Sequence, residues 1–430
     1  MSRRRTRAAA VVLFALALCA ALAGFAYNLP YVQDRLGWRI AEARARIKYA
    51  ISPPEKSVFT PNPTLVAMVQ ATLAALTPTP TLTATAGPTS TATIPPTPTI
   101  QPTPIPASVM LKGVRHEYQK WNNCGPANLA MALSYWGWQG DQRDTAAYMK
   151  PNPRDKNVMP YEMADFVREE TGLKIVVRVG GDLDLLKQFI AAGFPVLVEK
   201  GFDVPGKEWM GHYEVVTGYD DASQRFIVQD SYIMPDLPLP YDQVESDWRA
   251  FNYTYLVTYP PDREAEVMSI LGPQADELAN YKYAADKASS EIYTTTGRDQ
   301  FFAWYNRGTN LVWLRDYAGA AAAYDEAYKL DATLASADPA RRPWRILWYE
   351  TGPYFAYFYT NRYSDVINLA TQTLINSSEP ALEESWYWRA MARATLGDAA
   401  DAIDDLRTSL VWHPGFGPSL AELQKLGATP

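Results

Sequence analysis

The sequence predicts an α+β domain followed by an all-α region, with an apolar N-terminal helix and a Pro/Thr-rich linker ahead of both. Between residues 109 and 260, helical patterns come first and β-branched runs follow, an order typical of an α+β domain. Between residues 261 and 430, Ala-rich and aromatic helical patterns alternate. These changes in composition divide the chain into residues 1–30, 31–76, 77–108, 109–260 and 261–430.

Composition and charge restrict the possible partners. The 430 residues are 47% hydrophobic and 13% aromatic, which is enough for cores in two or three domains. The formal net charge of -7 argues against nucleic acid as a partner. Residues 1–50 depart from this average, because nine arginine or lysine residues face two acidic ones there. We therefore expect the basic N-terminal end to lie beside a membrane.

The stretch from Ala8 to Tyr27 is uninterruptedly small and apolar and follows four arginines. About 20 such residues can span a bilayer as a helix, and the arginines would stay in the cytoplasm. We expect a single-pass anchor in the cell membrane, with the bulk of the chain extracytoplasmic. A cleaved signal peptide is the alternative, because Ala21-Leu22-Ala23 has the small-x-small form of a cleavage site.

The next two segments are expected to separate the anchor from the folded domains. Residues 31–76 form a juxtamembrane helical segment, in which Gln33–Ala50 has an amphipathic pattern. Residues 77–108 consist largely of Pro, Thr, Ala and Ser, which cannot bury a core. We expect a disordered stalk here that is extended and partly polyproline II.

A cysteine lies at the predicted start of the first helix of the α+β domain. Asn122 and Asn123 precede Cys124, Gly125 and Pro126 follow it, and an apolar stripe then recurs at helical spacing through Leu129, Ala132, Leu133 and Trp136. The helix dipole and free N–H groups at this end favour a thiolate. A buried packing cysteine is the common alternative. Cys19 lies inside the apolar run, so Cys124 is expected to be the one thiol outside the membrane, without a disulfide partner.

A nucleophilic thiol needs a base, and the chain has 3 histidines. His413 belongs to the helical region, and His116 is eight residues before Cys124 and would have to fold straight back onto it. His212 opens a strand pattern that runs to Tyr219. His212 is therefore the predicted base.

Hairpin geometry indicates a partner for this histidine. The strand ending at Tyr219 is followed by a turn composition and by a second strand, Phe226–Asp230. A turn centred near Ala222 gives paired residue numbers that sum to about 444 and places His212 within one pleat of Asp230. Asp230 can then orient the imidazole, although an exposed hairpin end is the alternative.

The stretch from Gln119 through Cys124-Gly-Pro-Ala resembles the signature of papain-like cysteine peptidases of the bacteriocin-processing, double-glycine leader type. The resemblance runs from about Lys112 to Tyr259. It implies a papain-like fold with a Cys124–His212–Asp230 triad and with Gln119 completing the oxyanion hole. It also implies a peptide or protein substrate and neither cofactor nor metal. This chain has Ser231 where such peptidases often have Pro, and it has no Gly-x-x-x-x-Gly-Lys-Ser/Thr phosphate loop.

The region 261–430 fits the 34-residue tetratricopeptide pattern. One copy begins at Trp304, another at Trp386, and a weaker copy lies between Glu350 and Thr373. A plain helical bundle is the alternative. Stacked repeats form concave peptide-binding surfaces, so we expect protein partners.

These observations favour an extracytoplasmic, membrane-tethered cysteine peptidase whose repeats recruit a substrate or partner. Two other functions stay open. A non-catalytic peptide-binding scaffold could keep the same fold, and an acyl or amide transferase could use the same triad, because an amine can resolve a thioester instead of water.

Overall fold

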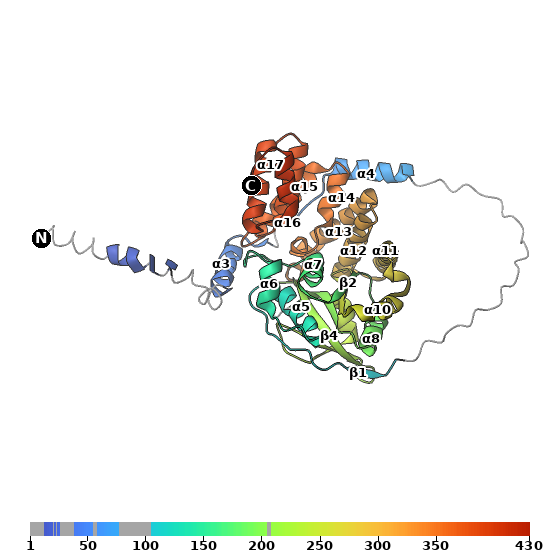
Figure 1. The fold of residues 1–430 in the computed structure, drawn as a ribbon. Helices are drawn as coiled ribbons and strands as arrows, with labels where there is room; N and C mark the ends of the chain where they lie inside the picture. Colours follow the sequence, from blue (N-terminus) through green and yellow to red (C-terminus); the bar gives the residue numbers. More distant parts are fainter. Residues whose placement is uncertain are drawn as a thin grey trace, which may run out of the picture. The chain divides into compact units, whose positions relative to one another are not determined.

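The computed structural model describes residues 13–19, 21–22, 24–25, 38–54, 58–76, 105–203 and 208–430 (Figure 1). The chain divides into two compact units. The smaller unit comprises Met1–Pro54 and Asn376–Ser378, and the larger comprises Glu55–Ile375 and Glu379–Pro430.

The smaller unit contains helix α3 (Trp38–Ile51), which lies in the predicted amphipathic stretch. Within this unit, the hydroxyl of Tyr49 accepts the Ser378 N–H at 3.1 Å. The predicted anchor Ala8–Tyr27 lies partly outside the described residues, and most of the predicted stalk lies outside them too. In the part of the chain that is described, no helix is both long and apolar enough to cross a membrane.

A seven-stranded sheet forms the centre of the α+β domain. Its strand order is β2-β7-β3-β4-β5-β6, and β1 pairs with β4. Every pairing among these described strands is antiparallel. The strands are β1 (Ser108–Met110), β2 (Lys174–Arg178), β3 (Val196–Phe202), β4 (Met210–Asp220), β5 (Arg225–Gln229), β6 (Leu237–Pro240) and β7 (Tyr255–Tyr259).

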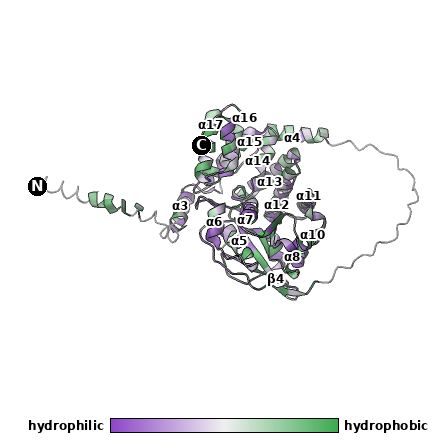
Figure 2. Ribbon diagram, in the orientation of Figure 1, coloured by the Kyte–Doolittle hydropathy of each residue, from purple (hydrophilic) through white to green (hydrophobic). Residues whose placement is uncertain are grey.

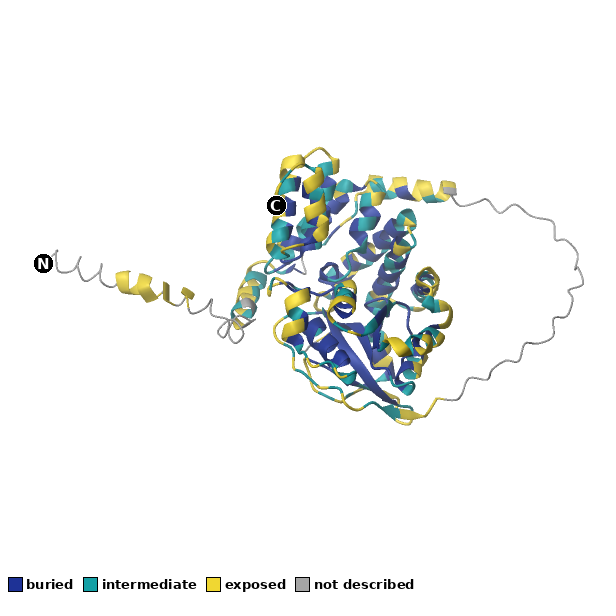
Figure 3. Cartoon of the chain, viewed as in Figure 1, coloured by how far each residue is buried: buried dark blue, intermediate teal, exposed yellow. Residues whose placement is uncertain are grey.

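Helices pack on both faces of this sheet because alternate strand residues point to opposite faces. Leu197 of β3 packs in a core with α5 and α7, whereas its neighbours Val196 and Val198 pack in a second core with α8 and α9. Strand β4 is buried along nearly its whole length (Figure 3). The helices are α5 (Cys124–Tyr135), α6 (Gln142–Met149), α7 (Pro160–Glu170), α8 (Leu183–Ala191), α9 (Tyr241–Arg249) and α10 (Glu264–Leu271).

The region after residue 271 is helical throughout its regular elements. Helix α12 packs against α13, and α16 packs against α17. The α-helices are α11 (Glu277–Thr294), α12 (Gly297–Trp313), α13 (Tyr317–Ala337), α14 (Gly352–Tyr359), α15 (Tyr363–Asn376), α16 (Glu383–Thr395), α17 (Ala399–Trp412) and α18 (Gly417–Lys425). The helical character is confirmed, and the assignment of these helices to tetratricopeptide repeats stays a prediction.

The helical region and the α+β domain belong to the same compact unit and share polar and apolar contacts. The side-chain amides of Asn252 and Asn310 are both buried and exchange two hydrogen bonds, at 2.8 and 2.9 Å. The Asn306 amide donates to the backbone carbonyl of Arg249 at 2.7 Å. Because buried amides are costly unless paired, these bonds fix the contact between α12 and the loop after α9.

A segment from before the linker also packs on the helical region. Helix α4 (Pro63–Leu76), which is mostly apolar (Figure 2), packs against α13. Phe59 is buried against Tyr328, with ring centroids 4.9 Å apart. The Asn62 N–H donates to the Asp365 carboxylate at 3.1 Å. Residues 58–76 are therefore an integral part of the larger unit.

Candidate active site

Cys124 is the first residue of α5, as the sequence predicts, and it is half-buried. The N–H groups of a first helical turn have no intrahelical acceptor, so they are free to bind an anion. Gly125 allows this turn to approach α7 closely. A Cβ atom at Gly125 would lie 2.7 Å from the Met163 Cε and 3.2 Å from the Val158 Cβ. The glycine after the cysteine thus sets how deeply the nucleophile sits.

His212 and Asp230 come together across the β4–β5 hairpin. Near the site, the pairs Val216–Val228 and Val215–Gln229 have residue numbers that sum to the predicted value. Asp230 directly follows β5, and its Oδ1 lies 3.2 Å from the His212 Nε2. The same oxygen accepts the N–H groups of Tyr232 at 2.7 Å and Ile233 at 2.8 Å. The carboxylate is therefore held in place before it meets the imidazole.

Because the Nε2 of His212 faces Asp230, its Nδ1 is the nitrogen available to the Cys124 thiol. The pKa values of the three groups reflect this arrangement. Burial raises the pKa of the Cys124 thiol, but the hydrogen bond and charge of His212, with the charge of Lys150, outweigh burial and lower this pKa below its ordinary value. Burial disfavours the imidazolium, yet Asp230 and Cys124 raise the pKa of His212 to about 9. Burial also works against the Asp230 charge, but His212 and Lys200 bring its pKa to about 2. These directions favour a thiolate–imidazolium pair near neutral pH.

Phe202 holds the imidazole from its face. Its ring stacks on His212 with centroids 4.4 Å apart and planes 19° apart. Phe202 is the last residue of β3 and follows the charged residues Glu199 and Lys200 in that strand. In the structure, the buried Lys200 lies 2.8 Å from the buried carboxylate of Glu214 on the neighbouring strand.

Gln119 lies beside the same site, and its amide is oriented by Ser231. The Gln119 N–H donates to the Ser231 carbonyl at 2.8 Å, and the Ser231 hydroxyl donates to the Gln119 Oε1 at 2.9 Å. The Asn128 amide of α5 donates to the Ser231 hydroxyl at 2.8 Å. Because the carbonyl end of the Gln119 side chain is bound, its NH₂ end is the end available to an oxyanion.

Lys150 is a buried cation behind the nucleophile loop. Its Nζ donates to the Asn122 carbonyl at 2.6 Å and to the Asn123 Oδ1 at 3.3 Å. Asn122 has a left-handed backbone with φ of 53°, a conformation that asparagine tolerates better than most residues. Lys150 therefore ties down the two residues before Cys124 and adds a positive charge near the thiol.

The other two histidines do not join the thiol. The His116 Nε2 lies 3.0 Å from the backbone carbonyl of Asp230, so His116 supports the loop that carries the carboxylate. His413 lies in the helical region, where its Nδ1 is 2.9 Å from the Glu383 Oε1. The structure thus brings together Cys124, His212 and Asp230, with Gln119 beside them.

The helical region contributes a residue next to the base. A Cβ atom at Gly211 would lie 2.8 Å from the Tyr349 ring, so the glycine before His212 makes room for this tyrosine. Arg345 donates to the Trp209 carbonyl at 2.8 Å and fixes the chain just ahead of β4. The sequence offered no signal for Tyr349, which is more than a hundred residues from His212.

The sequence patterns also did not indicate three other residues next to the catalytic groups, namely Phe202, Lys150 and Ser231. Only Ser231 carried a signal, because it stands at a position where the resembling peptidases often have proline. Phe202 and Lys150 reach the site through the packing of whole strands and helices, which local patterns do not report.

Residues 111–256 match the family described as Peptidase_C39 like family. The matched segment contains the cysteine, histidine, aspartate and glutamine described above. The match supports a papain-like cysteine peptidase domain in this part of the chain, and the double-glycine leader type stays a prediction.

Two solved structures are distantly similar. A C39-like peptidase from Bacillus anthracis is 19% identical, with a TM-score of 0.30, and the match covers 35% of this chain and 96% of that one. Xylellain, a cysteine protease from Xylella fastidiosa, is 13% identical, with a TM-score of 0.29, and the match covers 47% of this chain and 90% of that one. No curated protein matches the chain.

Proposed function

We propose that this protein is a cysteine peptidase that hydrolyses peptide bonds through Cys124, His212 and Asp230. The observation that carries this proposal is the position of His212, whose Nε2 lies 3.2 Å from the fixed Asp230 carboxylate and whose interaction with Cys124 lowers the pKa of the thiol. A packing cysteine would need neither an imidazole partner nor a carboxylate behind it. The family match over residues 111–256 supports the same activity.

In the first step, the Cys124 thiolate attacks the carbonyl carbon of the scissile peptide bond. The Cys124 N–H and the Gln119 side-chain NH₂ donate to the oxyanion that forms. The imidazolium of His212 then gives its proton to the leaving amine. The C–N bond breaks, and the acyl half of the substrate stays on Cys124 as a thioester.

In the second step, neutral His212 takes a proton from a water molecule that attacks the thioester carbonyl. A second oxyanion forms and is stabilised by the same two donors. When it collapses, the Cys124 thiolate leaves and the carboxylic acid product is released. Asp230 keeps its charge throughout, because its role is to orient His212 and to stabilise the imidazolium.

A peptide-library assay on the purified full-length protein tests this proposal. We expect cleavage products from the wild type and none from Cys124→Ala, together with a thioester adduct trapped on Cys124 in the wild type. Asp242→Asn, a change at an exposed residue of α9, serves as a matched control and should cleave normally. Equal cleavage by Cys124→Ala and the wild type would refute the assignment. Addition of a primary amine separates hydrolysis from acyl transfer, because a transferase would yield the amide product.

We also propose that residues 8–27 tether the chain to the cell membrane as a single-pass anchor, with the bulk of the chain outside the cytoplasm. The apolar length and the preceding arginines support this topology. Protease added to intact spheroplasts should cut residues 77–104. Protection until the cells are lysed would place the domain in the cytoplasm.

We further propose that the helical region recruits a protein substrate or partner, as the repeat pattern of the sequence suggests. Because Tyr349 of this region lies beside Gly211, a ligand held by these helices would be delivered close to His212. Pull-down with the Cys124→Ala variant, which retains uncleaved substrate, is the direct measurement. Loss of capture on deleting α16–α18 in a protein that stays folded would support the proposal, and unchanged capture would contradict it.

A further inference from the structure

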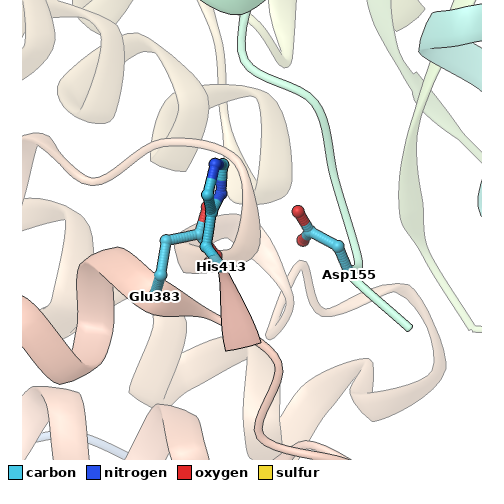
Figure 4. A group of neighbouring side chains, drawn as sticks. All are labelled: Asp155, Glu383 and His413. Atoms are coloured by element: carbon cyan, nitrogen blue, oxygen red, sulfur yellow. The ribbon is translucent and has the colours of Figure 1, made fainter. Parts of the chain in front are cut away.

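A group of side chains with metal-ligating atoms lies away from the catalytic residues, where three segments of the chain meet. Asp155 comes from the loop between α6 and α7, Glu383 is the first residue of α16, and His413 directly follows α17. Each offers one ligand atom, and these atoms all lie within 4.8 Å of one another. Figure 4 shows the Asp155 carboxylate turned toward the adjoining side chains of Glu383 and His413.

The group is buried and rich in carboxyl groups. Asp155 and Glu383 are each 4% exposed. Two further carboxyl groups, those of Glu162 on α7 and Glu384 on α16, lie close by, and burial raises the pKa of each well above its ordinary value. Lys150 and Lys156 are nearby cations, but the Lys150 ammonium group donates to Asn122 and Asn123, and that of Lys156 lies over the Trp348 ring. Buried carboxylates facing each other repel unless a cation or a proton lies between them.

The Asp155 carboxylate is also nearly without partners. Its Oδ1 accepts the Asn157 N–H at a long 3.4 Å, which is the one hydrogen bond of this carboxylate among the described residues. A buried carboxylate normally accepts several hydrogen bonds or binds a metal. The Asp155 carboxylate is turned toward the Glu383–His413 pair (Figure 4), and a cation would lie between the three side chains.

We propose that Asp155, Glu383 and His413 form a binding site for a divalent transition-metal ion of the zinc class. One imidazole nitrogen with two carboxylate oxygens is a set that Zn²⁺ accepts, whereas Ca²⁺ and Mg²⁺ prefer oxygen ligands alone. Tetrahedral ligands about 2.1 Å from zinc lie about 3.4 Å apart. The His413 Nδ1 and the Glu383 Oε1, which are 2.9 Å apart, would separate slightly around the ion, and the Asp155 carboxylate would move toward them. Water would complete the coordination.

The site joins the helical region to the loop that supports the nucleophile. The Asp155 carbonyl accepts the Asn122 side-chain NH₂ at 3.2 Å, and Asn122 is two residues before Cys124. A bound ion would therefore fix α16 and α17 to the segment that sets the position of the thiol. This consequence concerns the catalytic site, but the metal-binding proposal does not depend on peptidase activity.

Zinc binding to the full-length protein tests the proposal. All variants should carry Cys19→Ser and Cys124→Ser, because thiolates bind zinc on their own. After chelation, zinc is titrated in competition with a chromophoric chelator, and the melting temperature is recorded with and without zinc. We expect one zinc ion per chain and a higher melting temperature when it is bound.

Replacing the proposed ligands distinguishes a metal site from a simple ion pair. His413→Gln and Asp155→Asn should each weaken zinc binding by at least about a hundredfold and abolish the zinc-dependent rise in melting temperature. Asp155→Asn removes a buried charge, so it should fold at least as well as the parent without metal. Asp286→Asn, at an exposed carboxylate of α11, is the matched control and should bind zinc as the parent does. Equal zinc binding by the parent, His413→Gln and Asp155→Asn would overturn the proposal.

Discussion

Replacing Asp230 with asparagine tests the electrostatics of the site without removing the side chain. Asparagine still offers an oxygen to the His212 Nε2 and fills the same volume, but it carries no charge. The pKa of His212 is about 9 with the Asp230 carboxylate present and Cys124 beside it, against an ordinary value of 6.5. We therefore expect Asp230→Asn to move the pKa of His212 down toward 6.5.

The size of the effect follows from this difference. At pH 7.5, a histidine with a pKa of about 9 is about 97% protonated, whereas one with a pKa of 6.5 is about 9% protonated. The thiolate–imidazolium pair should then become up to about tenfold less populated. Tenfold is the upper limit of this charge effect because Cys124 also raises the pKa of His212.

Two assays on the Asp230→Asn variant measure this loss of the thiolate–imidazolium pair. The rate of iodoacetamide alkylation against pH reports the pKa of the Cys124 thiol, which should rise in Asp230→Asn because the imidazolium is lost. The alkaline limb of kcat/KM against pH reports His212 and should move to lower pH. Asp242→Asn is the matched control. If both profiles of Asp230→Asn coincide with those of the wild type, Asp230 does not act on His212 and the proposed triad is wrong.

Further predictions concern the neighbouring residues. Gln119→Ala should lower kcat by about a hundredfold to a thousandfold with KM little changed. Ser231→Ala should lower kcat by a smaller factor, because Ser231 only orients Gln119. A wild-type kcat in both variants would reject the oxyanion assignment. Gly125→Ala should lower the free energy of unfolding by about 1–3 kcal/mol, measured by urea denaturation, since its Cβ meets Met163 and Val158. The melting temperature advantage of wild type over Asp230→Ala should be full between pH 3.8 and 6.5. It should shrink as the pH falls through about 2, where Asp230 protonates, and as it rises through about 9, where His212 loses its proton. An advantage that is constant across this range would contradict the ion pair.

Local sequence patterns were sufficient to predict those parts of the site that depend on one helix or on two adjoining strands. The position of Cys124 at a helix start follows from Pro126 and the apolar stripe after it, although the side chain of Asn123 accepts from Lys150 and makes no capping hydrogen bond. The approach of Asp230 to His212 follows from the hairpin register. The bulge between Val216 and Gly218 was not visible in the sequence, but it shifts the register by only one residue.

The remaining neighbours depend on packing over long distances in the sequence. Strand β3 reaches Phe202 because the buried Lys200 is paired with Glu214, and a charged residue in a strand interior can be interpreted only when its partner is known. Tyr349 arrives beside His212 because two regions that the sequence separates at residue 260 share one compact unit. Composition and periodicity describe each region by itself and carry no signal for such a contact.

Because residues 58–76 pack on the helical region, the Pro/Thr-rich stretch does not link an anchor to the folded part of the chain. Helix α4 ends at Leu76 and the described chain continues from Ile105, both within the larger unit, so residues 77–104 connect two points of one unit. For the proposed anchor at residues 8–27, the chain that links it to the larger unit is therefore the part before Phe59 and does not include residues 77–104. A single proteolytic cut within residues 77–104 should produce two fragments on a denaturing gel that still migrate together under native conditions, because Phe59 and α4 keep the N-terminal fragment attached.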